Sequence, residues 1–333
     1  MLANLQMLRG LAALGVVFYH TDYRLPGDVH TEFQGVAVFF VISGFIMTYI
    51  TRKDANGFLT NRLIRIVPLY WVCTVAIALL AHANAWLTVK SLLFIPYFNF
   101  NHDPHPVLGV GWTLNMEIFF YALFALALLI SHRWAPVMVA ATIVAIVAAK
   151  KYSGCDSIAC TVYGHDYVSL FPIGIAAFYL WTAGRGLAAG IPLVTLLTVM
   201  AVAGEFVAYQ LQIVSPLTAW DNLALPGLIV LAALVCESAK WKAGAWALFL
   251  GNISYALYLT HTFTMELWLR SHIDFKHSTA AMVGTLAACV AVAACAHYWL
   301  ERPMMAVLRR IISGNTAARR GAGIRSQAPI ATS

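Results

Sequence analysis

Arg9 and His20 stand at the two ends of RGLAALGVVFYH, a stretch with no other charged residue. A helix advances about 1.5 Å and 100° per residue, so His20 would lie roughly 16 Å from Arg9 along the axis and on the same face. A guanidinium binds phosphate or carboxylate groups, and an imidazole exchanges protons near neutral pH. Ionisable residues in apolar helices usually line a cavity or reaction path, so we predict a functional stripe. The alternative is a structural histidine whose hydrogen bonds are satisfied.

A second basic pair occurs in TNRLIRIVPLYW, where Arg62 and Arg65 are three residues apart and share one helical face. Pro68 suits the first turn of a helix that enters a membrane. Two arginines at a helix start can hold phosphate groups through bidentate hydrogen bonds, and Arg9 is expected at the same membrane surface. The alternative is that the pair only anchors the helix on the cytoplasmic side.

Glu117 lies in the apolar stretch GVGWTLNMEIFFYALFAL. A buried carboxylate costs several kcal/mol, on the order expected for any unpaired intramembrane charge, unless it is paired or protonated. His20 is expected at a similar depth, so we predict that Glu117 supports His20 as a general base. A structural hydrogen bond between helices is the alternative.

A third polar group falls in GNISYALYLTHTF, where Ser254, Tyr258 and His261 occupy one face of a helix. Such a stripe lines a wet cavity or a neighbouring helix. Near the end of the last apolar segment, Glu301 is close to Arg302 and within reach of the predicted arginine group, and Pro303 bends or ends the helix. The residues expected to line a substrate cavity are Trp112, Ser254, Tyr255, Tyr258, His261 and Glu301.

These residues must be positioned by an all-α membrane protein. The chain of 333 residues is 61% hydrophobic and 11% charged, whereas soluble domains are about 25% charged. The net charge of +7 does not indicate nucleic-acid binding, because the basic residues are scattered between apolar segments. We therefore predict a polytopic integral membrane protein, with its first apolar segment retained as a span.

Hydropathy predicts about ten transmembrane helices. They cover residues 5–22, 34–50, 66–86, 108–130, 134–150, 168–183, 190–209, 223–237, 247–268 and 279–300. With both termini cytoplasmic, fifteen of the 21 Lys and Arg residues lie inside, which favours this orientation. Lys150 and Lys151 go against the rule, and Glu205 receives no role.

The outer loop SGCDSIACT contains Cys155 and Cys160, which would pair in an oxidising compartment; two free thiols are the alternative. His102 and His105 in NHDPHP could be mistaken for a metal site. The two prolines favour a rigid loop instead, and the sequence indicates no metal.

Six segments in chain order resemble the integral-membrane acyltransferases of the acyltransferase-3 type, in particular short bacterial exopolysaccharide O-acetyltransferases. They are RGLAALGVVFYH, GVAVFFVISGFI, NRLIRIVPLYW, GWTLNMEIFFY, ISYALYLTH and YWLERP, and they span nearly the whole chain. The Trp-Ser-Leu common in the family is Trp112-Thr113-Leu114 here, which keeps the hydroxyl.

The resemblance implies transfer of an acyl group, usually acetyl from acetyl-CoA, to a sugar hydroxyl of an exopolysaccharide, O-antigen or lipid-linked glycan precursor. It also implies that His20 is the catalytic base and that Arg9, Arg62 and Arg65 bind the acyl-CoA. The physics agrees, since phosphates need a basic cradle and the long pantetheine arm can carry the thioester about 16 Å inward.

Two other function classes remain at this point. A transporter or flippase for a lipid-linked glycan or organic acid would also use buried His and Glu, but the inverted repeats of many transporters are not found here. A noncatalytic scaffold would not explain ionisable residues at three depths. We expect a membrane domain at 1–303, a basic disordered cytoplasmic tail at 304–333, and a location in the bacterial inner membrane.

Overall fold

The computed structural model describes residues 2–21, 24–25, 29–30, 35–183, 218–238, 243–269 and 278–312. The regular secondary structure of these residues is helical, apart from one short antiparallel pairing of β1 (Arg24–Leu25) with β2 (Val29–His30). The longer helices are α1 (Ala3–His20), α2 (Gly35–Thr51), α3 (Phe58–Leu80), α5 (Trp112–Ile130), α6 (Ala135–Ser153), α8 (Leu170–Ala183), α10 (Thr218–Ser238), α11 (Ala245–Leu269) and α12 (Thr279–Ala296). The short helical elements are α4 (Ala85–Leu92), α7 (Ile158–Tyr163), η1 (Gly109–Gly111), η2 (Asp166–Ser169) and η4 (His297–Glu301).

The predicted helical membrane class is confirmed. Within the described residues, every predicted span has a matching helix, while the segment 190–209, with Glu205, lies outside them. Four described helices are long and apolar enough to cross a membrane, namely Phe58–Leu80, Gly109–Ile130, Ala135–Ser153 and Thr279–Ile312. The count of ten spans stays a prediction.

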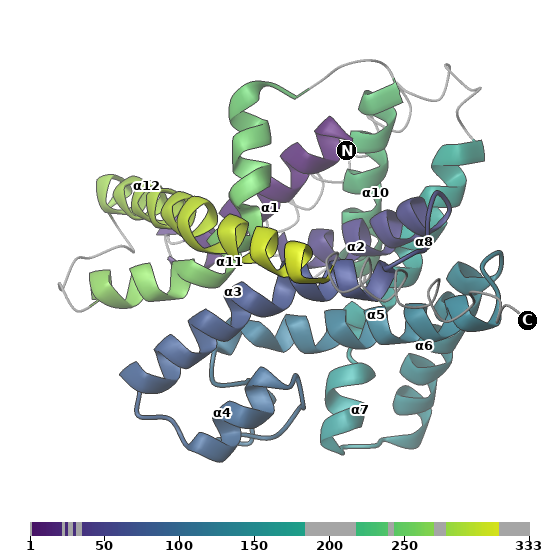
Figure 1. Ribbon diagram of the computed structural model, residues 1–333, viewed down its shortest axis with the longest axis horizontal. Coiled ribbons are helices and arrows are strands. Elements are labelled where there is room, and N and C mark those ends of the chain that lie inside the picture. Colours follow the sequence, from purple (N-terminus) through teal and green to yellow (C-terminus); the bar gives the residue numbers. More distant parts are fainter. Residues whose placement is uncertain are drawn as a thin grey trace, which may run out of the picture.

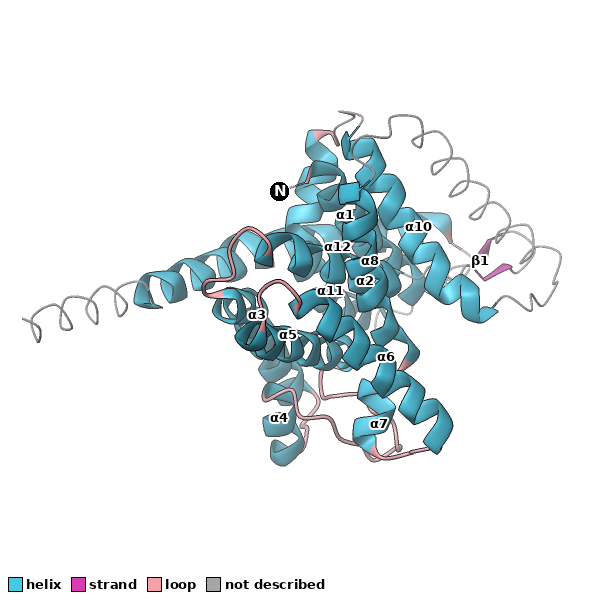
Figure 2. Ribbon diagram, turned by 90° about the vertical axis from the view of Figure 1, so that its right-hand side faces the viewer, coloured by secondary structure: helices cyan, strands magenta, loops and turns pink. Residues whose placement is uncertain are grey.

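The long helices pack against one another around α1, α2 and α11, and both α4 and α7 lie at the lower edge of each view (Figures 1 and 2). Each of these two short helices belongs to a connection. The segment with α4 joins α3 to α5, and the segment with α7 joins α6 to α8. These connections therefore cover the same end of the molecule.

Helix α3 begins eight residues earlier than predicted, after Gly57, which has a positive φ of 63°. Pro68 is therefore inside the helix, and its predicted place in the first turn is wrong. Proline has no N–H, so the carbonyl of Ile64 loses its usual helical donor. Two residues further on, the Tyr255 hydroxyl of α11 donates to the carbonyl of Ile66 at 2.6 Å, so a side chain supplements the backbone bonding next to the proline.

Helix α2 meets α8 at a pair of glycines. A Cβ atom on Gly44 would lie 2.1 Å from the carbonyl oxygen of Phe171, and one on Gly174 would lie 2.0 Å from the carbonyl oxygen of Val41. The backbones of the two helices are thus in direct contact, as small residues allow in membrane bundles.

Helix α1 makes a similar contact with α11. A Cβ atom on Gly10 would lie 2.7 Å from the backbone nitrogen of Gly251, and one on Gly251 would lie 2.1 Å from the carbonyl oxygen of Gln6. This contact fixes how the two helices lie side by side (Figure 1). It brings His20 and His261 together near the other end of α1.

The last helix continues through a π-helical turn, η4, to Ile312. In that turn the N–H of Arg302 bonds to the carbonyl of His297, five residues back. Pro303 follows directly, so the wider turn accommodates a residue that lacks an N–H. The first part of the predicted tail, 304–312, is therefore helical and not disordered as expected, and residues 313–333 lie outside the described residues.

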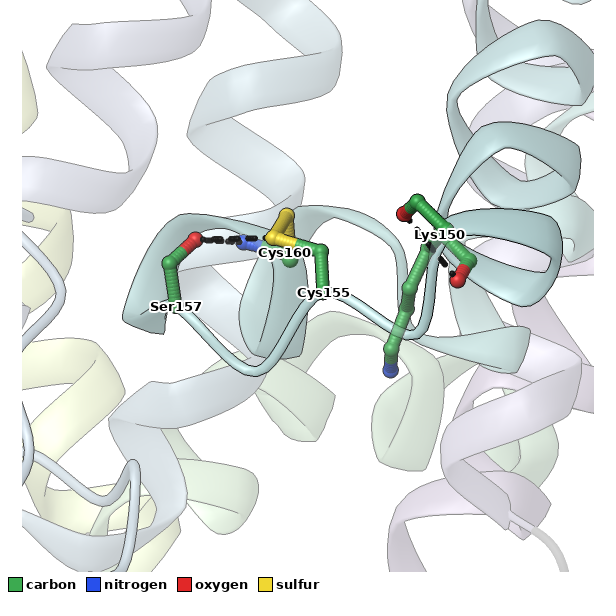
Figure 3. The surroundings of a disulfide bond; sticks show 5 residues. Lys150, Cys155, Ser157 and Cys160 are labelled. Carbon is green, nitrogen blue, oxygen red and sulfur yellow. Dashed lines mark hydrogen bonds between the residues drawn. A yellow bond between two sulfur atoms is a disulfide. The ribbon is translucent and has the colours of Figure 1, made fainter.

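The predicted disulfide between Cys155 and Cys160 is confirmed, with their Cα atoms 5.9 Å apart. It closes the start of α7, where the Ser157 hydroxyl accepts a hydrogen bond from the backbone N–H of Cys160 (Figure 3). The side chain of Lys150 packs against Gly164 at the other end of α7. The short helix is therefore held at both ends.

We predict that Gly44→Val prevents normal packing of α2 on α8, because its Cβ would meet a backbone oxygen that cannot rotate away. Overpacking of this kind costs about 1–3 kcal/mol or more. Thermal unfolding in detergent should show a clear drop in Tm. Gly284→Val in α12 is the matched control, since a Cβ there meets no heavy atom within 4 Å. Equal Tm values for both variants would contradict the glycine contact.

Candidate functional site

The predicted arginines line one cavity, which we call the arginine chamber. It lies between α1, α2, α3, α5 and α11 and has a volume of about 80 Å³. Its polar lining consists of Arg9, Ser43, Arg62, Arg65, Thr113, Glu117, Tyr121, Ser254, Tyr255 and Tyr258. The convergence of Arg9, Arg62 and Arg65 is thus confirmed, whereas their role stays a prediction.

The carboxylate of Glu117 belongs to this chamber. It accepts a hydrogen bond from the Ser43 hydroxyl at 2.8 Å and another from the Tyr121 hydroxyl. Tyr121 also interacts with the guanidinium of Arg62. Glu117 is therefore tied to α2 and to the arginine group by way of two hydroxyls.

Arg9 is the most deeply buried of the three arginines, with 8% of its surface exposed. Its Nη1 donates to the Gln6 side-chain oxygen at 3.3 Å. The charges that act on it include the neighbouring cation of Arg65 and the carboxylates of Glu117 and Glu301. A buried guanidinium needs such countercharge because leaving it unpaired is costly.

His20 lines a second and larger cavity, the histidine chamber, of about 530 Å³. Its lining consists of Val16, Tyr19, His20, Val36, His105, Gly109, Val110, Trp112, Tyr167, Tyr258 and Thr262. His20 is the last residue of α1, and its Nδ1 lies 2.8 Å from the carbonyl oxygen of Val16. In the neutral ring Nδ1 therefore carries the hydrogen, and Nε2 is left as a lone-pair base.

The predicted pair of His20 with Glu117 is wrong. The imidazole Nδ1 bonds to its own helix, while Glu117 bonds to Ser43 and Tyr121 in the other chamber. Helical spacing gave both residues a similar depth, but it does not fix how α1 and α5 are rotated and shifted against each other.

A second imidazole lies beside the first. The ring centroids of His20 and His261 are 5.0 Å apart, and His261 is fully buried. The Nδ1 of His261 lies 3.2 Å from the carbonyl oxygen of Leu257, and its Nε2 has no hydrogen-bond partner. Both rings are thus held in the same way, each by the carbonyl four residues earlier.

The two chambers share a wall made by Val36 and Tyr258. The Tyr258 hydroxyl lies 2.9 Å from the carbonyl oxygen of Val110 and 2.8 Å from the hydroxyl of Thr113. The acyltransferases that the sequence resembles often have serine at the position of Thr113. The Thr113 hydroxyl holds Tyr258 in place. The chambers are therefore neighbours separated by one anchored ring.

On its other side the arginine chamber adjoins a surface cleft of about 330 Å³. The cleft is lined by Ile50, Asp54, Asn56, Phe58, Asn61, Arg62, Arg65 and Arg309. Arg62 and Arg65 line both the surface cleft and the arginine chamber. Because the arginine chamber also shares a wall with the histidine chamber, it borders the other two cavities. Sequence reasoning missed Arg309, because it was counted only as an inside charge after a presumed helix end.

Most of the other predicted cavity residues line one of the chambers. Ser254 and Tyr255 border the arginine chamber, Trp112 borders the histidine chamber, and Tyr258 borders both. Glu301 is in neither lining, and its carboxylate bonds to Nδ1 of His297 at 2.7 Å. Its predicted position within reach of the arginine group agrees with the action of its charge on Arg9. Its expected neighbour Arg302 lies over the ring of Tyr298 instead.

Other residues of the site were not predicted. Tyr121 follows Glu117 by four residues, a spacing that signals contact on a helix. Ser43 gave no comparable signal, because its bond to Glu117 depends on the contact between α2 and α5. Tyr167 and Thr262 likewise reach the histidine chamber through packing that no local pattern reveals.

Residues 2–298 match an acyltransferase domain. The chain is 31% identical over 299 residues to the exopolysaccharide production protein ExoZ of Rhizobium meliloti, covering 84% of this chain and 92% of that protein. It is 27% identical over 311 residues to nodulation protein 10 of Rhizobium leguminosarum bv. viciae, covering 79% and 83%. The O-acetyltransferase OatA of Staphylococcus aureus is 32% identical over 166 residues, 40% of this chain and 26% of its own length. No solved structure gives a significant match.

We predict that Glu117→Ala destabilises the fold, because it removes a carboxylate whose charge acts on Arg9 and Arg62 and which accepts hydrogen bonds from two hydroxyls. Leaving buried donors without their acceptor costs about 1–3 kcal/mol. Thermal unfolding in detergent measures the effect. Asp103→Ala is the control, because Asp103 is exposed in a loop away from the arginines. The charge-balance argument fails if both variants unfold at the wild-type temperature.

Proposed function

The chain belongs to the acyltransferase-3 family, and from that premise we propose that it transfers an acetyl group from acetyl-CoA to a sugar hydroxyl. The acceptor is an exopolysaccharide, an O-antigen or a lipid-linked precursor of either. The names of the relatives, an exopolysaccharide production protein and an O-acetyltransferase, support this choice of substrates. Because the chain belongs to a family of enzymes, we no longer consider the transporter alternative.

The arrangement of the cavities is the single observation that carries the proposal. Arg9 and His20 stand on one helix about 16 Å apart, and the cavities that they line share a wall. The donor has phosphates at one end and a thioester at the end of a long thin arm. It matches a cationic cleft that leads through a narrow chamber toward a base.

In this proposal Arg62, Arg65 and Arg309 hold the phosphates of the donor in the surface cleft. Guanidinium groups suit this task because they form paired hydrogen bonds to phosphate oxygens. The pantetheine arm then passes Arg9 in the arginine chamber and carries the thioester toward the wall formed by Tyr258. Glu117 balances the arginines and has no direct part in proton transfer.

The transfer itself is a direct attack. Nε2 of His20 takes the proton of the acceptor hydroxyl, and the oxygen forms a bond to the thioester carbonyl carbon. The carbon–sulfur bond breaks, and the leaving thiolate receives the proton from His20. Oxygen gains the acetyl group, and free CoA and an ester are the products. The hydrogen bond from Nδ1 to Val16 keeps the base oriented.

We propose the membrane arrangement that fits this reaction. Both termini and the surface cleft face the cytoplasm, which supplies acetyl-CoA, and about ten spans cross the bacterial inner membrane. The membrane domain covers 1–303, and the tail that follows begins with the helical residues 304–312. The disulfide near α7 supports this orientation, because its end would face the oxidising side.

We predict that His20→Ala lowers the rate of acetyl transfer by two to four orders of magnitude, about the usual contribution of a general base. Acetyl-CoA should still raise the Tm of this variant, because its binding site is intact. The assay follows radiolabelled acetyl groups from acetyl-CoA into polysaccharide. His132→Ala, in the exposed turn between α5 and α6, is the control. A folded His20→Ala protein with the normal rate would exclude His20 as the base.

We predict that Arg62→Ala and Arg65→Ala each weaken acetyl-CoA binding about ten- to a hundredfold, the loss expected for one charge-assisted hydrogen bond. Ligand binding raises the Tm, so a series of acetyl-CoA concentrations measures the affinity. Arg52→Ala is the matched control, because Arg52 is exposed and donates to the hydroxyl of Tyr179, outside the cleft. Equal affinities in all three variants would contradict the donor site.

A further inference from the structure

We propose that Trp112, Tyr167 and His165 form a binding platform for a pyranose ring of the acceptor, beside His20. This inference rests on the proposed function and deepens it, because it assigns the sugar to a particular wall of the histidine chamber. We call these three residues the aromatic platform. It is built where α5 begins and where the segment after α7 leads into α8.

The three rings pack as one group. The centroids of Trp112 and Tyr167 are 5.8 Å apart with their planes at 25°, a stacked arrangement. His165 lies 5.7 Å from Trp112 and 5.2 Å from Tyr167. All three side chains are half-buried, so the group is neither a core cluster nor a free surface patch.

The platform borders open space on two sides. Trp112 and Tyr167 line the histidine chamber together with His20. On the other side, Trp112 and His165 line a recess of about 150 Å³, which is completed by α7 residues. The larger chamber, at about 530 Å³, is within the size range of pockets that bind small organic ligands.

The lining of the histidine chamber disfavours the phosphates of acetyl-CoA and favours a neutral polyol. Among the described residues that line it there is no Lys or Arg, so it offers phosphates no countercharge. A pyranose has an apolar face of C–H groups and a rim of hydroxyls. The face stacks on aromatic rings, and the rim needs hydrogen-bond donors and acceptors, which imidazole and phenol groups supply.

The Nε2 atom of His165 can donate a hydrogen bond. Its Nδ1 accepts a hydrogen bond from the backbone N–H of Tyr167 at 3.2 Å, so in the neutral ring Nε2 carries the hydrogen. Burial lowers the pKa of His165, which keeps the ring neutral at pH 7. His165, which lines the recess, therefore offers an N–H to the rim of a sugar at the platform, while His20 offers a lone pair from the histidine chamber.

The disulfide loop supports the platform from behind. Thr161 and Val162 of α7 line the recess next to His165, and α7 is closed at its start by Cys155 and Cys160 (Figure 3). Gly164, directly before His165, packs closely on the side chain of Lys150. The segment that carries two of the three platform rings is thus fixed to α6 and α7.

The test compares Trp112→Ala with Trp134→Ala. Trp134 is exposed at the start of α6 and lines neither chamber, which makes it the matched control. The acceptor probe is bacterial exopolysaccharide cut to oligosaccharides and freed of esters by mild alkali, and acetyl-CoA is the donor. We expect Trp112→Ala to raise the acceptor KM about tenfold, equivalent to about 1.4 kcal/mol, and to leave the acetyl-CoA affinity unchanged. Trp112→Phe should restore most of the acceptor affinity.

Each outcome decides a separate question. If the wild-type protein does not transfer acetyl groups to the probe, the proposed function fails, whatever the platform does. If the wild type is active and Trp112→Ala has the wild-type acceptor KM, or loses only kcat, the platform proposal is wrong. If Trp112→Ala does not fold, His165→Ala decides by the same acceptor KM, with the acetyl-CoA affinity as the test of its integrity.

Discussion

The excess of positive charge inside the helix bundle is the constraint on which the rest of the site depends. Three guanidiniums line a chamber of about 80 Å³ in which Glu117 is the carboxylate of the described lining. Glu301 adds a second negative charge near Arg9, but it is already bonded to His297. Buried charges are costly unless they are paired. The excess of positive charge favours the binding of an anion, and the adjoining cleft, with Arg309, adds a further cation.

The close contact of α1 with α11 fixes where the functional groups of α1 lie in the bundle. Because Gly10 and Gly251 bring the backbones into contact, α1 cannot slide or rotate on its partner without a clash. The separation of Arg9 from His20 is then set by helix geometry alone, at roughly 16 Å. The same crossing puts His261 beside His20 and keeps Tyr258 between the chambers. One pair of glycines thus positions groups in both chambers.

The sequence predicted what depends on position along a helix and failed where helices meet. Arg9, Arg62 and Arg65 converge as expected, because charge bias brings helix ends to one membrane face. The pairing of His20 with Glu117 was wrong, because depth along two helices says nothing about their relative rotation. Pro68 misled for another reason. Proline rules describe isolated helices, whereas here α3 runs through the proline, and Tyr255 of α11 bonds to the nearby carbonyl of Ile66. At Pro303 the π-helical turn directly before the proline lets the helix continue.

If the protein has the function proposed above, the difference in charge between the two chambers explains how a single shared wall can separate its two substrates. An anionic donor gains electrostatic energy in the cleft and the arginine chamber, but the histidine chamber offers it no cation. A neutral sugar gains less from the guanidiniums than a phosphate does. Among the described linings of the cleft and the two chambers, imidazoles occur only in the histidine chamber, which His20 and His105 line. Each substrate is therefore held back by desolvation on the wrong side. Only the uncharged end of the donor, its thioester, can approach the wall at low cost, and that end is the part that reacts.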